Sequence, residues 1–210
     1  MPRILIADAY EVVRSGLQRI LQAQANLEVV AVACDGSEAI KKAIETRPDI
    51  GVIGYALPLI NGLEVTRQIR ARLPETEILI FTIQEDQSVI DQLLRAGARG
   101  YVLKSDANDQ LLAAIEALVA RKPFFTARVS EALLYSFNER TDHEASSLTP
   151  RESQVVQLIA EGYTSKSIAR FFKVSPKTVE TQRRAISKKL NISSTAGLVR
   201  YAIRKKVIEA

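Results

Sequence analysis

Cationic and hydrogen-bonding side chains recur at helical spacing between positions 176 and 190, where a helix is predicted. At about 100° per residue, one side of this helix carries Lys177, Thr181, Arg184 and Lys188. The opposite side carries a narrow apolar stripe of Val179, Ile186 and Leu190. The polar side could bind a polyanion, because ammonium, guanidinium and hydroxyl groups pair with phosphate oxygens and base edges. Taken alone, the same pattern also describes an amphipathic helix with a solvated charged face.

A shorter helix is predicted just before this one. Its apolar side chains Ile168 and Phe172 lie four positions apart, on one face. Ser175 is a natural N-cap for the following helix, and Pro176 suits the first helical position, where no N–H is needed. The small side chain of Ala169 lets the two helices approach closely. Two short helices joined by a tight turn, the second with a polar outer face, are typical of a helix-turn-helix.

Charge is unevenly distributed along the 210 residues. The first 121 residues hold 13 Lys and Arg against 16 Asp and Glu, a net charge of −3. Residues 122–210 hold 16 against 8, a net charge of +8. A basic C-terminal part beside a mildly acidic remainder indicates which part meets a polyanion.

Residues 1–121 alternate short apolar runs with amphipathic stretches. This alternation predicts an α/β domain with a doubly wound, five-stranded parallel sheet and helices on both faces. The strands are expected at 3–7, 28–33, 50–53, 77–82 and 100–103, and the helices at 12–23, 36–46, 62–73, 87–96 and 106–120. Working groups in such sheets gather at the carboxyl ends of the strands. Those ends are Asp8, Gly54, Thr82 and Lys104.

Residues 122–147 are expected to form a linker with a short helix. Pro123 stops the preceding helix, and a short amphipathic segment is expected at residues 127–137. Residues 138–147 are polar and lack periodicity, which is typical of a flexible connection. His143, the only histidine, has no other His or Cys nearby. We therefore expect no metal site and no cofactor.

Cysteine usage and hydropathy predict the compartment. No apolar run approaches the roughly 18 residues needed to span a membrane, and the N-terminus reads as a strand rather than a signal peptide. The single cysteine, Cys34, permits no internal disulfide, which is typical of a reducing cytoplasm. Because it ends an apolar run, Cys34 is expected to be a buried thiol. We expect a cytoplasmic protein without a membrane partner.

The C-terminal stretch carries several short motifs at fixed places. They are Leu148–Glu152 at its start, Glu161–Gly162 after one helix, Val174–Glu180 at the turn, and Lys188–Leu190 at the end of the next helix. In these positions it resembles the four-helix, all-α DNA-binding domain of the LuxR/NarL/FixJ transcription factors. One departure is Gln182, where that family usually has His. The resemblance implies a helix-turn-helix domain over residues 148–210 that binds specific DNA sequences.

The N-terminal 121 residues carry a second set of matching positions. These are Asp8, Pro58, Gly62, Thr82 and the run Gly100–Lys104. They resemble the receiver domain of two-component response regulators. A receiver followed by a LuxR-type domain is the architecture of the NarL/FixJ response regulators, and the two resemblances together span nearly the whole chain.

The residues on which receiver chemistry depends are incomplete. In the family the phosphoacceptor aspartate lies six residues after the Pro of a Pro-Asp pair, which places it here at Gly54, after Pro48. The family's acidic pair, which holds Mg²⁺, is reduced to Asp8 because its neighbour is Ala9. Gly54 has no side chain to phosphorylate, and a lone carboxylate binds Mg²⁺ poorly. The resemblance therefore implies an atypical receiver that lacks the phosphoacceptor aspartate.

Two sets of residues follow as candidates. The DNA-binding candidates are Lys177, Thr178, Glu180, Thr181, Arg183, Arg184 and Lys188. Of these, Arg184 could bind guanine through two hydrogen bonds, and Lys188 is expected to meet phosphate. The degenerate receiver pocket, called the strand-end pocket below, comprises Asp8, Ala9, Gly54, Thr82, Tyr101 and Lys104. Within it we expect Lys104 to neutralise Asp8, Thr82 to offer a strand-end hydroxyl, and Tyr101 to be a half-buried ring.

These observations predict a DNA-binding transcription regulator that is not an enzyme and that works independently of aspartyl phosphorylation. The expected partners are double-stranded DNA and a second copy of the chain, with RNA polymerase and an unidentified protein or ligand at the receiver left open. A last helix carries an apolar stripe of Ala196, Val199 and Ile203. Part of this stripe must pack within its own domain, so only the remainder could contact the second copy in a homodimer. Two alternatives remain, namely a phosphotransfer receiver with an unusual acceptor, such as Glu11, and a protein-interaction adaptor.

Overall fold

The computed structural model describes residues 1–127, 129–131, 148–205 and 207–208. The chain divides into two compact units, Met1–Arg140 and Thr141–Ala210, and each is treated by itself. The expected amphipathic segment at 127–137 falls largely outside the described residues, and the polar stretch with His143 falls there entirely. Among the described helices, none is long and apolar enough to cross a membrane.

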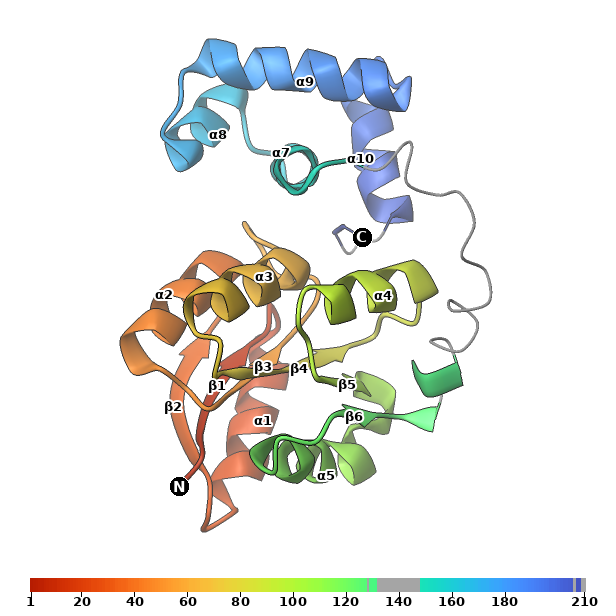
Figure 1. Cartoon of the computed structure of the whole chain (residues 1–210). Helices are drawn as coiled ribbons and strands as arrows, with labels where there is room; N and C mark the ends of the chain where they lie inside the picture. The colour runs from red at the N-terminus through yellow and green to blue at the C-terminus, as the bar shows by residue number, and fades with distance from the viewer. Residues whose placement is uncertain (128, 132–147, 206, 209–210) are drawn as a thin grey trace. The chain divides into compact units, whose positions relative to one another are not determined.

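The first unit is built on a parallel sheet. Its strands are β1 (Arg3–Ala7), β2 (Glu28–Ala33), β3 (Ile50–Ile53), β4 (Glu77–Thr82), β5 (Gly100–Leu103) and β6 (Phe124–Phe125), and their order is β2-β1-β3-β4-β5-β6. The helices are α1 (Glu11–Gln22), α2 (Gly36–Thr46), α3 (Gly62–Arg72), α4 (Gln87–Arg95) and α5 (Ala107–Val119), with a 3₁₀ turn, η1, at Lys104–Asp106. Figure 1 shows α1 and α5 on one face of the sheet and α2, α3 and α4 on the other. The doubly wound parallel fold is therefore confirmed.

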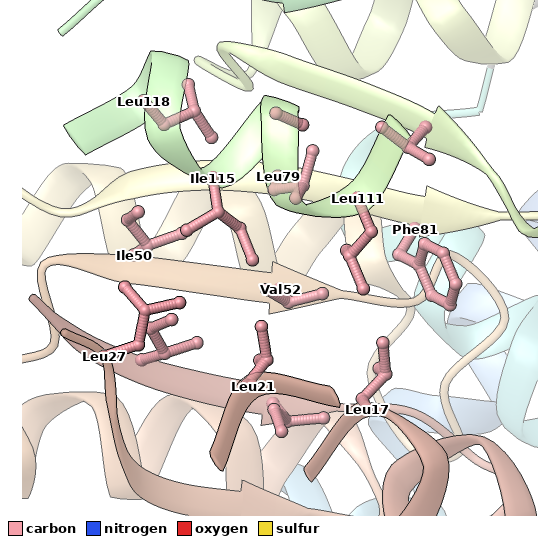
Figure 2. Packing of buried hydrophobic residues seen from close by; sticks show 14 residues of the cluster. Leu17, Leu21, Leu27, Ile50, Val52, Leu79, Phe81, Leu111, Ile115 and Leu118 are labelled. Atoms are coloured by element: carbon pink, nitrogen blue, oxygen red, sulfur yellow. The ribbon is translucent and has the colours of Figure 1, made fainter. Parts of the chain in front are cut away.

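The core between α1, α5 and the sheet follows the two-residue period of the strands. Alternate residues of β1, β3 and β4 point to this face, and residues of α1 and α5 meet them from the other side (Figure 2). The buried members of this cluster are Ile4, Ile6, Leu17, Leu21, Leu27, Ile50, Val52, Leu79, Phe81, Val102, Leu111, Ala114, Ile115 and Leu118. This packing fixes the strands, and with them the carboxyl edge that carries the strand-end pocket.

The structure corrects the sequence prediction at both edges of the sheet. Phe124 and Phe125 were assigned to the linker, but they form a sixth strand that pairs with Gly100 and Tyr101. At the other edge, Cys34 is exposed rather than buried. Strand β2 is an edge strand in which residues 29–32 are half-buried and only Ala33 is fully buried, so the chain leaves the core as soon as the strand ends.

The second unit is helical in its described part. Its helices are α7 (Pro150–Ala160), α8 (Ser165–Phe172), α9 (Pro176–Leu190) and α10 (Thr195–Arg204). Each begins at a hydroxyl N-cap whose oxygen accepts a backbone N–H, in the order Thr149, Thr164, Ser175 and Ser194. At α7 the cap is reciprocal, because Glu152 also accepts the N–H of Thr149. These caps fix where each helix begins and therefore which side chains of α9 face outward.

Candidate nucleic-acid interface and strand-end pocket

Helix α9 buries one side and exposes the other, as its periodicity predicts. Val179 and Ile186 are fully buried within the domain. The exposed residues are Pro176, Lys177, Thr178, Glu180, Thr181, Arg184, Ala185, Lys188 and Lys189. Six of the seven DNA-binding candidates therefore lie on the exposed part of the helix, and Arg183 does not.

Arg183 is half-buried and binds within its own domain. Its Nη1 donates to Ser165 Oγ at 3.0 Å, and its Nη2 donates to Thr195 Oγ1 at 3.3 Å. Ser165 and Thr195 are the first residues of α8 and α10. One guanidinium thus joins the starts of two helices to the middle of α9, a role that a helical wheel of α9 alone does not reveal.

Lys189 is also engaged internally. Its Nζ lies 2.8 Å from Glu152 Oε2, so it ties the last turn of α9 to the N-terminal cap of α7. The ammonium group and the N–H of Thr149 together lower the pKa of Glu152. Its neighbour Lys188 is exposed, as are Lys177 and Arg184. Arg183 and Lys189 therefore make contacts within the domain, although Lys189 is also exposed, and Lys177, Arg184 and Lys188 are the other exposed cations of α9.

In the strand-end pocket, Asp8 and Lys104 form a short ion pair. Asp8 is only 2% exposed, and its Oδ2 lies 2.7 Å from Lys104 Nζ. Its Oδ1 accepts the N–H of Tyr10 at 3.0 Å, and the Tyr10 ring lies 5.4 Å from the same ammonium group. The expected neutralisation of Asp8 by Lys104 is confirmed. Tyr10 was not foreseen, although its place directly after the first strand could have suggested it.

Gly54 leaves no room for a larger residue while this pair is in place. Gly54 is buried, and its N–H donates to the carbonyl of Ala7 at 2.8 Å. A Cβ atom at this position would lie 2.8 Å from Asp8 Oδ2, closer than real Cβ contacts. The carboxylate of Asp8 therefore occupies the space in front of the third strand.

The other pocket residues are held by the loop after β4. The Thr82 hydroxyl oxygen accepts the N–H of Gln84 at 3.2 Å, which fits the expected strand-end role. The Tyr101 hydroxyl donates to the Gln84 carbonyl at 2.9 Å. Tyr101 was expected to be half-buried, but it is 0% exposed, and this burial raises its pKa. At Ala9 the backbone is braced by Arg14, which donates to its carbonyl at 2.8 Å.

The strand-end pocket does not fit the divalent cation that the receiver resemblance implies. Mg²⁺ prefers several oxygen ligands in octahedral geometry, whereas the pocket has one carboxylate, which is already paired with an ammonium group. In the described chain, the one cluster with three possible ligand side chains lies elsewhere, at Cys34, Asp35 and Glu38. Its carboxylates are engaged in the start of α2, where Asp35 accepts the N–H of Glu38 and Glu38 pairs with Lys42. That pairing lowers the pKa of Glu38 to about 2.

Comparison with known families gives two matches. Residues 4–116 match the response regulator receiver domain, and residues 146–202 match the bacterial regulatory proteins of the luxR family. These ranges contain the strand-end pocket and helix α9 respectively.

Among curated proteins, the chain is similar to oxygen regulatory proteins NreC over almost its whole length. It is 38% identical over 216 residues to the NreC of Staphylococcus epidermidis (strain ATCC 12228 / FDA PCI 1200), covering 99% of both chains. It is 36% identical over 215 residues to the NreC of Staphylococcus carnosus (strain TM300), again covering 99% of each.

Solved structures give the same result. A LuxR-family two-component response regulator from Aurantimonas sp. SI85-9A1 is 34% identical, with a TM-score of 0.63 over 66% of this chain and 99% of that one. RcsB from Salmonella enterica serovar Typhimurium, bound to promoter P1flhDC in the presence of the phosphomimetic BeF₃⁻, is 25% identical, with a TM-score of 0.62 over 95% and 97% of the chains. A further RcsB structure holds two dimers on two parallel DNAs, and it has 25% identity and a TM-score of 0.60 over 95% and 96%.

Proposed function

This chain belongs to the response regulators of the NarL/FixJ family, with a receiver domain and a luxR-family regulatory domain, and we propose that it binds specific DNA sequences and regulates transcription without aspartyl phosphorylation. As members of this family are regulators and not enzymes, no catalytic residue is assigned. The proposal rests chiefly on one observation. In the pocket in which the family performs phosphoryl transfer, position 54 offers no acceptor side chain, and the remaining carboxylate, Asp8, is paired with Lys104.

Phosphoryl transfer to a receiver needs a carboxylate to attack and a metal ion to offset the developing charge. Gly54 supplies no side-chain oxygen, and the carboxylate next to it, that of Asp8, already lies 2.7 Å from the ammonium group of Lys104. Two other acidic residues near the first and third strands are poorly placed to replace the acceptor. Asp49 accepts the N–H of Arg3 before β3 begins, at the opposite end of the strand from Gly54. Glu11 is exposed in the first turn of α1.

DNA binding is supported by the exposed cations and hydrogen-bonding groups of α9. Lys177 and Arg184 are exposed on the side of the helix that would enter a major groove. Lys188 lies further along the same side, where it would meet phosphate. Glu180 lies at the edge of this side, beyond Arg184, and would be tolerated near phosphate only where it accepts a hydrogen bond from cytosine.

A homodimer is the form that we expect on DNA. One recognition helix covers too few base pairs for genomic specificity, so paired half-sites are the common solution. Helix α10 packs on its own domain through Leu198 and Ala202, whereas Ala196 and Ile203 are exposed. These exposed residues, with half-buried Val199, form a surface that a second copy could cover.

The central experiment measures DNA binding and phosphorylation together. The unmodified full-length protein is mixed with its operator, with and without acetyl phosphate and Mg²⁺, and the intact mass is recorded. We expect no phosphoryl mass shift and an operator affinity within about twofold of that without phosphodonor. A tenfold gain in affinity accompanied by a phosphoryl mass shift would overturn the proposal, and peptide mapping would then identify the unusual acceptor.

Two restoring variants make the same measurement sharper. Replacing Ala9→Asp and Gly54→Asp together supplies both missing carboxylates, and this double variant should become labelled. Gly54→Asp alone should label weakly, because the Mg²⁺ site stays incomplete and the new side chain meets Asp8. Equal labelling of the single and the double variant would show that the missing metal ligand does not matter.

A further inference from the structure

Two exposed threonines of α9 have their hydroxyl groups engaged within the helix. Thr181 Oγ1 donates to the carbonyl of Lys177 at 3.0 Å. Thr178 Oγ1 lies 2.8 Å from Ser175 Oγ, the N-cap oxygen that also accepts the N–H of Thr178. In both threonines the hydroxyl group is therefore hydrogen-bonded, and the methyl group is the part of the side chain that remains for contact with a ligand. Ala185, which is also exposed, contributes a third methyl group.

These three methyl groups lie together on one flank of the exposed face. At about 100° per residue, Thr178, Thr181 and Ala185 fall within an arc of about 60°. Glu180 and Arg184 fall on the other flank, about 40° apart. The lysines at positions 177 and 188 separate the two groups. Below, the first group is called the methyl flank and the second the charged flank.

We propose that the methyl flank contacts the 5-methyl groups of thymines in the operator, so that each half-site carries T·A pairs beside the G·C pairs facing the charged flank. This inference rests on the proposed DNA-binding function and adds the chemical character of the DNA to it. The thymine methyl is the one apolar group at the base edges of the major groove. Alanine and the methyl group of threonine are the partners that suit it.

The engaged hydroxyls matter for specificity. A free threonine hydroxyl can donate to or accept from several bases and discriminates little between them. Because the Thr181 hydroxyl already donates its proton to the Lys177 carbonyl, it has no donor left for a base. Apolar contact is then the main interaction that Thr181 can make. The charged flank behaves differently, because Arg184 can donate twice to guanine and Glu180 can accept from cytosine. The two flanks therefore favour different bases.

The test begins with a selection of bound duplexes from a random DNA library by the purified full-length protein. Each thymine in the selected half-site is then replaced by deoxyuridine, which lacks only the 5-methyl group. We expect at least one replacement to weaken binding about fourfold, the effect of losing one buried methyl group. The control replaces thymines outside the half-sites and should leave affinity unchanged.

Matched protein variants assign the contact. Thr181→Ser keeps the hydroxyl and removes the methyl, so its affinity should no longer respond to deoxyuridine at the contacted position. Thr181→Val keeps the methyl and removes the hydroxyl, so the response should persist. A response that persists in Thr181→Ser and is lost in Thr181→Val would show that the contact does not use the Thr181 methyl group and would overturn the inference.

The possible failures can be told apart. Should the selection enrich no sequence, the proposed DNA-binding function falls and this inference falls with it. Should a sequence be enriched whose affinity changes less than about twofold when all half-site thymines are replaced, the methyl contact alone is wrong and the proposed function stands.

Discussion

The strand-end pocket and the exposed face of α9 both carry charged residues, but they differ in what those charges contact. In the pocket, Asp8 and Lys104 are paired with each other at 2.7 Å. On α9, Lys177 and Arg184 are exposed to solvent. A charge that is paired inside the protein has little left to offer a ligand, whereas an exposed cation can exchange its water and counterions for phosphate. The comparison indicates which of the two surfaces is available to bind a polyanion.

The same distinction divides the cations within the second unit. Arg183 holds Ser165 and Thr195, and Lys189, itself exposed, holds Glu152, whereas their exposed neighbours Arg184 and Lys188 are left to face solvent. Adjacent residues of the same type therefore serve as matched controls for each other.

Breaking the pocket pair should have the largest effect. Lys104→Met leaves the Asp8 carboxylate buried without its cation, and we expect it to lower the free energy of unfolding by about 3 kcal/mol. Urea denaturation measures this. Adding Asp8→Asn removes the orphaned charge and should recover most of the loss. If Lys104→Met alone lowered the free energy of unfolding by less than about 1 kcal/mol, the Asp8–Lys104 pair would behave like an exposed ion pair.

The second largest effect is expected from removing the exposed guanidinium of Arg184, which should weaken specific DNA binding. Arg184→Ala should cost about 2 kcal/mol of affinity for the operator and much less for unrelated DNA. Titration of both DNAs at one salt concentration measures the difference. Lys188→Ala is the matched control and should weaken both DNAs similarly, with a smaller salt slope. Equal losses on both DNAs for Arg184→Ala would assign this residue to phosphate contact.

Removing the internal guanidinium should act through stability. Arg183→Ala leaves two hydroxyls without their donor, so we expect the second unit to lose about 1–2 kcal/mol of unfolding free energy. Affinity should then fall on operator and unrelated DNA alike, because the orientation of α9 is less well fixed. Thermal unfolding and the two DNA titrations measure these effects. Unchanged stability with a loss confined to the operator would make Arg183 a base-reading residue instead.

The smallest predicted effect concerns acid stability. The pairing of Glu38 with Lys42 and with the Cys34 N–H lowers its pKa to about 2 from an ordinary 4.5. A carboxylate whose folded pKa is depressed stabilises the protein above its unfolded pKa, and this contribution is lost as pH falls from about 4.5 to about 2. Because the pair is partly exposed, we expect less than about 1 kcal/mol. In Glu38→Gln, the melting temperature should depend less on pH in this window, and an unchanged slope would refute the assignment.

Much of the fold could be read from residue patterns because the responsible interactions are local. Each of the five predicted strands coincides with an observed one, since buried parallel strands read as continuous apolar runs bounded by polar residues. The start of α9 was predictable from Ser175 and Pro176, which act within a single turn. The Asp8–Lys104 pair followed from the rule that parallel strand ends meet at one edge.

What could not be predicted depends on contacts between distant segments. Strand β6 is only two residues long, and it forms because Gly100 and Tyr101 offer a free edge. Cys34 is exposed because β2 lies at the other edge of the sheet, a matter of strand order that its own apolar run does not reveal. Similarly, the partners of Arg183 lie 18 and 12 positions away, beyond the reach of helical periodicity.

The close approach at Gly54 bears on the order in which mutations could supply the two carboxylates that the family's phosphoryl transfer uses. A side chain at position 54 would meet Asp8 Oδ2, and an aspartate there would place two carboxylates together without a metal. The first step is therefore unfavourable unless the residue at position 9 has already changed, so the effect of each substitution depends on the other. Under the proposed function, a lineage that carries both Gly54 and Ala9 would face a barrier to gaining phosphorylation. Drift at single sites would then favour other ways of controlling the protein.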